Sequence, residues 1–244
     1  MKIESLQNER VKNWCKLQEK KYRDQTGLFL VEGTHLVKEA LSYGYVVEII
    51  TTDNEEYAVP TYHVTTEIMK KISEQASPSS IIAVCKKMEE KMITGSVLLL
   101  DGIQDPGNLG TIIRSAVAFN IPNIVLSESC VDLYNSKVIR STEGMLFSIN
   151  VIRANLCETI QKLKQDNYSV YGTDVLGGKD VCSVNIQEPL AFVIGSEGKG
   201  MSNEVKALCD SFFYIKMNES CESLNAGVSA SILMYEINKQ RGEG

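Results

Sequence analysis

Three glycine-containing stretches hold most of the polar side chains that could do chemistry. The first is DPGNLGTIIR, residues 105–114, in which Asn108, Gly110 and Arg114 have the spacing N-x-G-x-x-x-R. Amide groups of a turn and of a helix start can face an anion, and an arginine about one turn into the helix can point back toward them. The stretch lacks the phosphate-loop and dinucleotide-binding glycine patterns. A plain strand–turn–helix connection does not explain two glycines, an asparagine and an arginine together.

The second stretch, IGSEGKGMS at residues 194–202, has three glycines in six residues. This density at a strand end predicts a backbone wrapped closely against something. Glu197 in the middle disfavours a nucleotide phosphate and suits a nearby cationic group, such as a sulfonium or an arginine. Ser196 and Lys199 match the S-x-x-K of penicillin-binding enzymes, but the companion S-D-N and K-T-G patterns are missing.

The third stretch is MNESCESLNAG, residues 217–227, where Ser223 and Asn225 flank Leu224 just before a helical pattern. Ser and Asn are common helix caps, and taken alone this stretch predicts only capping.

The elements around these stretches predict an α/β protein with two parts. In the larger part, strands alternate with helices, which is typical of a parallel sheet covered on both faces and binding its ligands at the carboxyl ends of the strands. All three stretches follow such strands. The expected strands are 96–101, 123–127, 168–174, 190–198 and 212–217, and the expected helices are 108–119, 154–165, 202–209 and 225–240. A charged linker at 86–96 separates this part from a smaller unit, with helices at 8–22, 34–44 and 64–75 and strands at 27–33, 45–51 and 79–87.

Composition excludes several classes of protein. The chain is 43% hydrophobic and 23% charged, which is typical of a globular protein and not of a disordered one. No apolar run is long enough to cross a membrane, and the N-terminus has no apolar signal core, so we expect a soluble cytoplasmic protein. Seven scattered cysteines without C-x-x-C and only two histidines predict reduced thiols and no metal site.

The net charge of −6 is unfavourable for binding nucleic acid, but the charge is unevenly distributed. Residues 1–23 contain seven basic and three acidic side chains, with Trp14 and Tyr22 among them. This segment could bind RNA. It could equally be a solvated helix face with Trp14 packed inward.

Together the three stretches resemble a known family. NLGTIIR, FVIGSEGKGMS and IKMNESCESLNAGVSASI are similar, in order and spacing, to the three motifs of the SpoU/TrmH branch of the SPOUT RNA methyltransferases, and the resemblance covers 97–240. The stretch from Arg10 to Leu41 resembles the ribosomal-protein-like substrate-binding domain that precedes the catalytic domain in members acting on ribosomal RNA.

The resemblance implies a fold and an activity. Residues 1–90 would be an RNA substrate-binding domain, and residues 96–244 a catalytic domain whose mostly parallel sheet ends in a deep trefoil knot. The protein would be a homodimer that binds S-adenosylmethionine and methylates a ribose 2′-hydroxyl of ribosomal RNA, most simply of the large subunit.

The resemblance also implies roles for individual residues. Lys216 stands where the family usually has a proline, which affects the shape of one loop. Because a guanidinium stays protonated in proteins, we expect Arg114 to stabilise the developing alkoxide and not to act as a base, with Asn108 and Glu197 holding its planar group. The implied residues are Asn108, Arg114, Glu197, Ser223 and Asn225 for catalysis, Gly195, Gly200, Ile215, Met217 and Leu224 for the cofactor, and Arg10, Lys12 and Arg140 for RNA.

Two alternatives remain open. The target could be transfer RNA, or the chain could be a non-catalytic RNA-binding or ribosome-assembly protein on the same fold. A degenerate copy should have lost Arg114, Glu197 or Asn225, and all three are present. A Rossmann-type dehydrogenase is excluded because no strand is followed by G-x-G-x-x-G.

Overall fold

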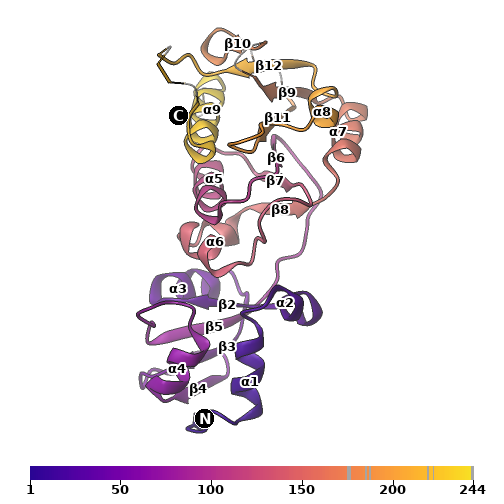
Figure 1. Cartoon of the computed structure of the whole chain (residues 1–244). Coiled ribbons are helices and arrows are strands. Elements are labelled where there is room, and N and C mark those ends of the chain that lie inside the picture. Colours follow the sequence, from indigo (N-terminus) through magenta and orange to yellow (C-terminus); the bar gives the residue numbers. More distant parts are fainter. Residues whose placement is uncertain (175–176, 185, 187, 219, 222, 243–244) are drawn as a thin grey trace. The chain divides into compact units, whose positions relative to one another are not determined.

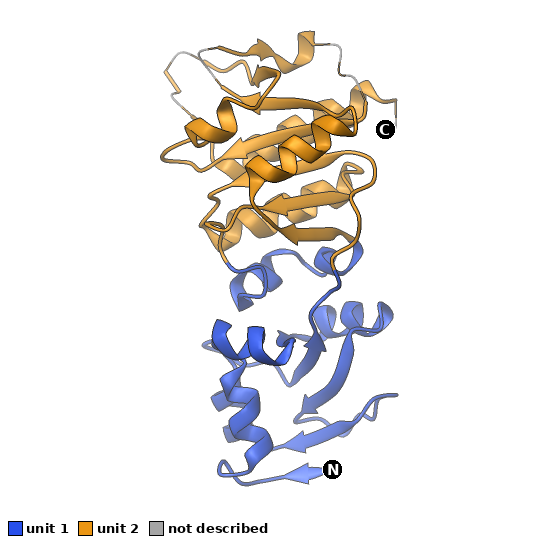
Figure 2. Cartoon of the chain, turned by 90° about the vertical axis from the view of Figure 1, so that its right-hand side faces the viewer, with its two compact units in different colours: residues 1–89, 132–148 blue, residues 90–131, 149–244 orange. Residues whose placement is uncertain are grey.

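The chain forms two compact units, and one segment inserted in the sequence of the second unit packs with the first. The computed structural model describes residues 1–174, 177–184, 186, 188–218, 220–221 and 223–242. Unit 1 comprises residues 1–89 and 132–148, and unit 2 comprises residues 90–131 and 149–244 (Figure 2). The expected ranges, 1–90 and 96–244, are contiguous and did not anticipate that residues 132–148 pack with the N-terminal unit.

Unit 1 is built on a five-stranded mixed sheet (Figure 1). Strands β3 and β5 pair antiparallel, as do β2 and β5, whereas β4 runs parallel to both β1 and β3. In sheet order the strands are β1 (Lys2–Ile3), β4 (Thr61–Val64), β3 (Val46–Thr51), β5 (Ile81–Lys86) and β2 (Leu28–Glu32). The helices are α1 (Glu9–Lys16), α2 (Lys20–Thr26), α3 (Thr34–Ser42), α4 (Thr66–Ile72) and α6 (Ser136–Ser141), with a 3₁₀ turn η1 (Met145–Ser148).

The expected single helix at 8–22 is wrong, because it is broken into α1 and α2. Arg23 of α2 is buried and donates hydrogen bonds to the carbonyls of Leu17 (2.8 Å) and Gln18 (2.7 Å). These bonds satisfy carbonyl groups that would otherwise be orphaned at the end of α1. A second difference is small: Gly33, with φ of 111°, caps α3, and Thr34 is the first helical residue.

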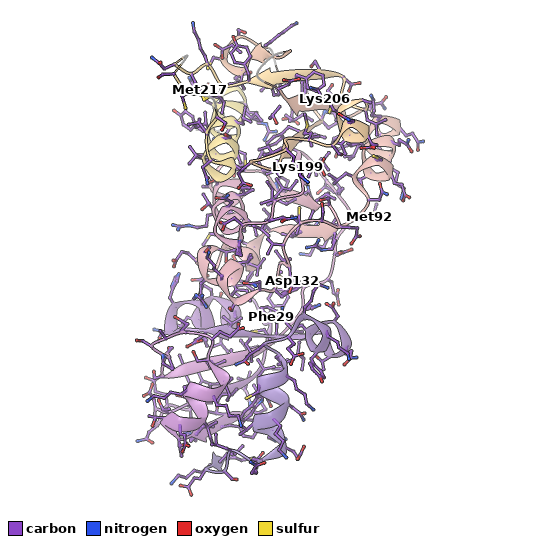
Figure 3. All side chains as sticks on the ribbon, in the orientation of Figure 1. Phe29, Met92, Asp132, Lys199, Lys206 and Met217 are labelled. Atoms are coloured by element: carbon purple, nitrogen blue, oxygen red, sulfur yellow. The ribbon has the colours of Figure 1, made fainter. Side chains whose placement is uncertain are left out.

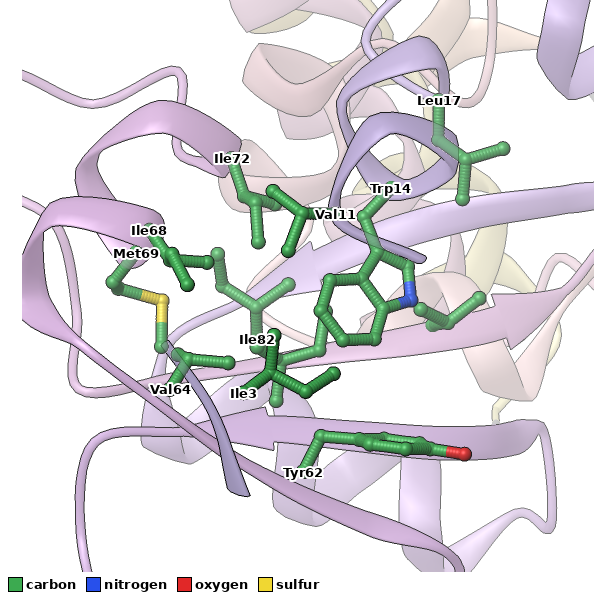
Figure 4. Close-up of a cluster of buried hydrophobic side chains, with 12 residues drawn as sticks. Ile3, Val11, Trp14, Leu17, Tyr62, Val64, Ile68, Met69, Ile72 and Ile82 are labelled. Atoms are coloured by element: carbon green, nitrogen blue, oxygen red, sulfur yellow. The ribbon is translucent and has the colours of Figure 1, made fainter. Parts of the chain in front are cut away.

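Trp14 packs inward, as one of the two interpretations of the N-terminal segment expected. Its side chain is 3% exposed and lies in a cluster with Val11, Ile68 and Ile82 (Figure 4). This burial concerns the ring alone, and the RNA-binding role of the basic side chains around it stays a prediction.

Residues 132–148 cover the other side of the unit 1 sheet. Asp132 forms an ion pair with Arg23 at 2.7 Å, and both side chains are largely buried. The rings of Tyr134 and Phe29 lie 4.6 Å apart between centroids, and Phe147 stacks on Tyr45 at 5.7 Å. Because Phe29 is completely buried, this segment is part of the hydrophobic core of unit 1.

Unit 2 contains the parallel sheet that the sequence predicted. All seven strands pair parallel. In sheet order they are β10 (Lys179–Asp180), β12 (Ser211–Tyr214), β9 (Ser169–Thr173), β11 (Leu190–Gly195), β6 (Val97–Asp101), β7 (Asn123–Leu126) and β8 (Asn150–Arg153). Helices α5 (Pro106–Ala118) and α9 (Ala226–Gln240) lie on one side, and α7 (Leu156–Gln165) and α8 (Asn203–Lys206) on the other (Figure 1); a 3₁₀ turn, η2, spans Val181–Ser183.

The core of unit 2 explains why its strands were predictable. Val97 and Leu99 are completely buried and pack with Ile160 and Leu163 of α7. A strand covered on both faces reads as a continuous apolar run, and VLLL does so. Within the described part of the chain, no helix is long and apolar enough to cross a bilayer.

Candidate active site

The three predicted stretches converge at one edge of the unit 2 sheet. They follow β6, β11 and β12, and the strand order β12-β9-β11-β6 places these strands side by side or one strand apart. In a parallel sheet the carboxyl ends of such strands share an edge. Figure 3 labels Lys199 and Met217, which belong to the second and third loops.

The first loop is shorter than expected, and this changes the position of Arg114. Asp105 caps α5, accepting a hydrogen bond from the Asn108 amide at 2.9 Å, and Pro106 occupies the first helical position. The helix therefore starts two residues before the expected 108. Arg114 lies about two turns into α5, not one.

The second loop folds into a tight turn whose shape requires glycine at one position. Ser196 and Gly200 exchange backbone hydrogen bonds of 3.1 and 2.9 Å. A Cβ at Gly195 would lie 2.1 Å from the carbonyl carbon of Gly200 and 2.2 Å from the Met201 amide nitrogen. Gly195 therefore lets the end of β11 close against residues 200–201.

Asp101, which the sequence reasoning missed, anchors this turn. Its Oδ2 accepts hydrogen bonds from the Ser202 amide (2.7 Å) and from the Ser202 hydroxyl (2.8 Å). Asp101 ends β6, so these bonds tie the first strand of the site to the second loop. An acidic residue at the carboxyl end of a predicted strand was the available signal.

Three of the predicted polar residues form one hydrogen-bonded chain. The side-chain amide nitrogen of Asn108 donates to the Glu197 carboxylate, and the side-chain amide nitrogen of Asn225 donates to Asn108 Oδ1 at 2.8 Å. Each residue comes from a different loop, so the chain connects all three.

Arg114 is not part of this chain, contrary to the expectation that Asn108 and Glu197 would hold its guanidinium. Its side chain is exposed and makes no hydrogen bond or ion pair with any residue that the structure describes. The two expected partners bond to each other instead.

Asn225 has two roles at once. Its Oδ1 accepts a hydrogen bond from the Val228 amide at 3.2 Å and caps α9, as the capping interpretation predicts. Its amide nitrogen is free to donate to Asn108. The capping and active-site interpretations are thus compatible, because they use different atoms of one side chain.

A cavity of about 210 Å³ lies beside the hydrogen-bonded side chains of Glu197, Asn108 and Asn225. Two of the predicted catalytic residues, Glu197 and Ser223, line it. Lys216, the departure from the family pattern, is exposed and lies outside the lining. All five predicted cofactor residues line it as well: Gly195, Gly200, Ile215, Met217 and Leu224.

Sequence reasoning missed the contribution of β9 to this cavity. Thr173 and Asp174 line it from the carboxyl end of that strand. Asp174 also forms an ion pair with Lys206 at 2.5 Å. The position of β9 between β12 and β11 requires this contribution, but strand order is not visible in the sequence.

The side chains that line the cavity fit S-adenosylmethionine. Its described lining includes the carboxylates Asp174 and Glu197 and no lysine or arginine. Apolar side chains such as Leu224, Phe213 and Leu233 make up much of the rest. Because Asp174 is already paired with Lys206, Glu197 is the carboxylate that suits the positive charge of the ligand, and the apolar wall suits an adenine ring.

The predicted RNA-binding residues lie in unit 1. Arg10 and Lys12 are on α1, where they form ion pairs with Glu48 (3.3 Å) and Glu9 (2.7 Å). Arg140 is on α6 and is half-buried. Their role in RNA binding stays a prediction.

Comparison with known proteins identifies the family. The model of the SpoU rRNA Methylase family matches residues 95–235, more than half of the chain. The chain belongs to the SpoU rRNA methylase family. A second family model, the MRM3-like substrate binding domain, matches residues 8–83.

Relatives of this SpoU-family protein are similar over nearly the whole chain. The 23S rRNA (guanosine(2553)-2′-O)-methyltransferase RlmP of Bacillus subtilis is 39% identical, over 96% of this chain and 98% of that protein. The SpoU methyltransferase AviRb of Streptomyces viridochromogenes, solved with AdoMet, is 26% identical with a TM-score of 0.89, covering 98% of this chain and all of that one. An AdoMet-bound rRNA methyltransferase of Sinorhizobium meliloti is 25% identical with a TM-score of 0.87, covering 98% and 97%.

These comparisons confirm the predicted family, the fold class and the methyltransferase class. The trefoil knot follows from this fold. S-adenosylmethionine as the cofactor agrees with the AdoMet-bound relatives and with the lining of the cavity.

Proposed function

We propose that this SpoU-family protein transfers a methyl group from S-adenosylmethionine to a ribose 2′-hydroxyl of large-subunit ribosomal RNA. The observation that carries the proposal is the cavity at the carboxyl edge of the sheet, which has carboxylates but no cation in its described lining. The chain Glu197–Asn108–Asn225 borders it. The similarity to a 23S rRNA 2′-O-methyltransferase over nearly the full chain supports the same target class.

The residues of the chain have definable tasks in this reaction. S-adenosylmethionine, when bound, would supply an electrophilic methyl group bonded to its sulfonium sulfur, which leaves as a neutral thioether. The second loop and Leu224 would hold it by backbone and apolar contacts, and Glu197 would place negative charge near its positive one. The hydrogen bonds of Asn108 fix the Glu197 carboxylate in one orientation.

The attacking 2′-oxygen gains negative charge as it loses its proton, so the site needs a fixed positive charge nearby. Arg114 is the predicted source, and a guanidinium provides that charge without titrating. We propose that it stabilises the developing alkoxide and orients an adjacent phosphate through two parallel hydrogen bonds.

We further propose that the active site is completed by a second copy of the chain. Along α5, Arg114 is about 9 Å from Asn108 and turned about 120° around the helix axis, so the two side chains leave different faces. The same side of unit 2 exposes apolar residues of α9: Val228 is 46% exposed and Tyr235 50%. Packing this surface against its symmetric counterpart would bury them and bring Arg114 to the cavity of the partner.

Unit 1 is proposed as the RNA-binding module. Its match to an MRM3-like substrate binding domain and the basic segment 1–23 support this role. Arg10, Lys12 and Arg140 are the residues we assign to RNA contacts in it.

The test is incubation of the purified protein with methyl-labelled S-adenosylmethionine and unmodified ribosomal or transfer RNA. The proposal predicts label on a ribose of large-subunit RNA, seen as resistance of one phosphodiester bond to alkaline cleavage. Label confined to transfer RNA would support the alternative target. Cofactor binding without label on any RNA would support a non-catalytic RNA-binding protein.

A further inference from the structure

Unit 1 contains a second cavity, of about 370 Å³, that the methyl-transfer reaction does not use. Its lining comes from α1, α2 and the sheet strands β2, β3 and β5. The walls include Trp14, Leu17 and Tyr22, and the polar groups at its border include Arg10, Lys16 and Glu48. A mostly apolar cavity with charged groups in its lining is suited to an aromatic heterocycle.

A carboxylate is fixed at this cavity. Glu48 is only 16% exposed, and its Oε1 accepts a 2.6 Å hydrogen bond from the indole nitrogen of Trp14. Figure 4 shows this nitrogen on the side of the ring away from Ile68 and Met69. Oε2 accepts a 3.3 Å hydrogen bond from the Arg10 guanidinium, with which Glu48 forms an ion pair. A carboxylate has about four acceptor sites, and the bonds to Trp14 and Arg10 use one on each oxygen, so each oxygen of Glu48 keeps capacity for a further bond.

Two cations, Arg10 and Lys16, belong to the lining of the cavity, and Lys21 lies near its Tyr22 wall. The ammonium groups of Lys16 and Lys21 lie 5.7 and 6.0 Å from the ring centre of Tyr22, which is itself half-buried. Arg10 is 51% exposed and lies over the ring of Tyr62 at 4.7 Å. These three cations can contact the phosphates of a nucleic acid when one of its bases enters the cavity.

We propose that this cavity binds an unpaired guanine base of the RNA substrate. This inference rests on the proposed function, since it assigns a base-specific contact to the substrate-binding unit. Guanine presents two adjacent N–H donors on its Watson–Crick edge, which match a carboxylate, whereas uracil offers only one. Tyr22 and the apolar wall take the face of the base, and Lys16, Lys21 and Arg10 take the flanking phosphates.

Trp14 makes the proposal directly measurable, because it is the only tryptophan of the chain and lines this cavity. The full-length protein is titrated with three RNA hexamers: uridines with one guanosine, the same with inosine in its place, and uridines alone. Inosine keeps one of the two donors. We expect saturable quenching of Trp14 fluorescence by the guanosine hexamer, and binding about tenfold weaker for inosine and weaker still for uridine.

Two variants separate stacking from base reading. Tyr22→Ala should weaken the guanosine hexamer about tenfold or more, because it removes a stacking surface. Glu48→Gln keeps an acceptor for the Trp14 indole but loses one acceptor for guanine, so it should abolish the preference for guanosine over uridine. Tyr57→Ala removes a tyrosine of the same unit that does not line the cavity and should bind like the wild type. Circular dichroism of each variant verifies folding.

The outcomes distinguish this inference from the proposed activity. With ribosomal RNA, Tyr22→Ala should raise KM and leave kcat unchanged, because the cavity binds substrate without touching the reacting atoms. If the wild-type enzyme methylates RNA, but Tyr22→Ala and Glu48→Gln keep the wild-type KM and the wild-type preference for guanosine, the proposed base cavity is wrong and the proposed activity stands. Guanosine-selective quenching without methylation of any RNA would support the cavity and contradict the activity.

Discussion

The two roles of Asn225 can be separated by substitution. Asn225→Asp keeps an oxygen that can accept from the Val228 amide, and it adds negative charge at the start of α9, which helix dipoles favour. It replaces the amide donor that reaches Asn108 Oδ1 at 2.8 Å with a second acceptor. The cap is therefore preserved while the link between the third and first loops is lost.

The magnitudes follow from the interactions involved. Removing a helix cap costs about 1 kcal/mol, which lowers Tm by roughly 2–4 °C in a protein of this size. Asn225→Ala should show this loss, whereas Asn225→Asp should keep the wild-type Tm or exceed it. In Asn225→Asp, Asn108 and Glu197 lose their fixed geometry, and a misplaced active-site group typically costs about 10- to 100-fold in rate.

The assay is a single-turnover methyl transfer to ribosomal RNA together with thermal unfolding of each variant. Asn225→Ser keeps a capping oxygen but cannot donate to Asn108 in the same way. It is a second variant of the same kind, and its rate should fall as that of Asn225→Asp does. If Asn225→Asp and Asn225→Ser methylate at the wild-type rate while Asn225→Ala is merely less stable, the residue is only a cap and the reasoning fails.

Further predictions concern Arg114, the second loop and the thiols. Arg114→Lys keeps the charge but loses the planar guanidinium, so kcat should fall about 100-fold. The rate of the wild-type enzyme should not follow the titration of a base between neutral and mildly alkaline pH. Near-normal turnover of the lysine variant would contradict this role. Gly195→Ala should weaken S-adenosylmethionine binding more than tenfold by calorimetry, because its Cβ meets backbone 2.1 Å away, whereas an added Cβ at Gly198 meets nothing within 4 Å and Gly198→Ala is the control. Burial raises the pKa of the Cys85 thiol, so mass spectrometry after alkylation should find exposed Cys221 modified in the native protein and Cys85 only after unfolding.

The proposed second copy of the chain is tested by co-expressing Arg114→Ala and Glu197→Gln subunits carrying different tags. If Arg114 serves the site of its partner, a mixed dimer has one site with both native residues, and purified mixed dimers should regain about half of the wild-type activity. Mixed dimers as inactive as either parent would show that Arg114 acts within its own chain.

The sequence was most informative where local pattern and topology agree. Continuous apolar runs such as residues 97–100 identified buried parallel strands, and parallel strands must bring their following loops to one edge. The convergence of Asn108, Glu197 and Asn225 was predictable for this reason. Which of them bond to one another was not, because side-chain partners depend on strand order and loop shape.

The misses have different physical causes. Strand β8 was not predicted because its residues are all half-buried and show no clear alternation. The packing of residues 132–148 on unit 1 depends on the contact of Tyr134 with Phe29, which are more than one hundred positions apart in the chain. The start of α5 was a missed signal, since Asp105-Pro106 is a recognisable cap followed by proline at the first helical position.

The most direct test of the central claim is nucleoside mass spectrometry of ribosomal RNA treated with S-adenosylmethionine and either the wild-type protein or Arg114→Ala. We predict a single 2′-O-methylated nucleoside in large-subunit RNA for the wild type, and its near-complete loss for Arg114→Ala with unchanged cofactor affinity. Methylation of a base instead of a ribose, or an undiminished yield from Arg114→Ala, would contradict the account.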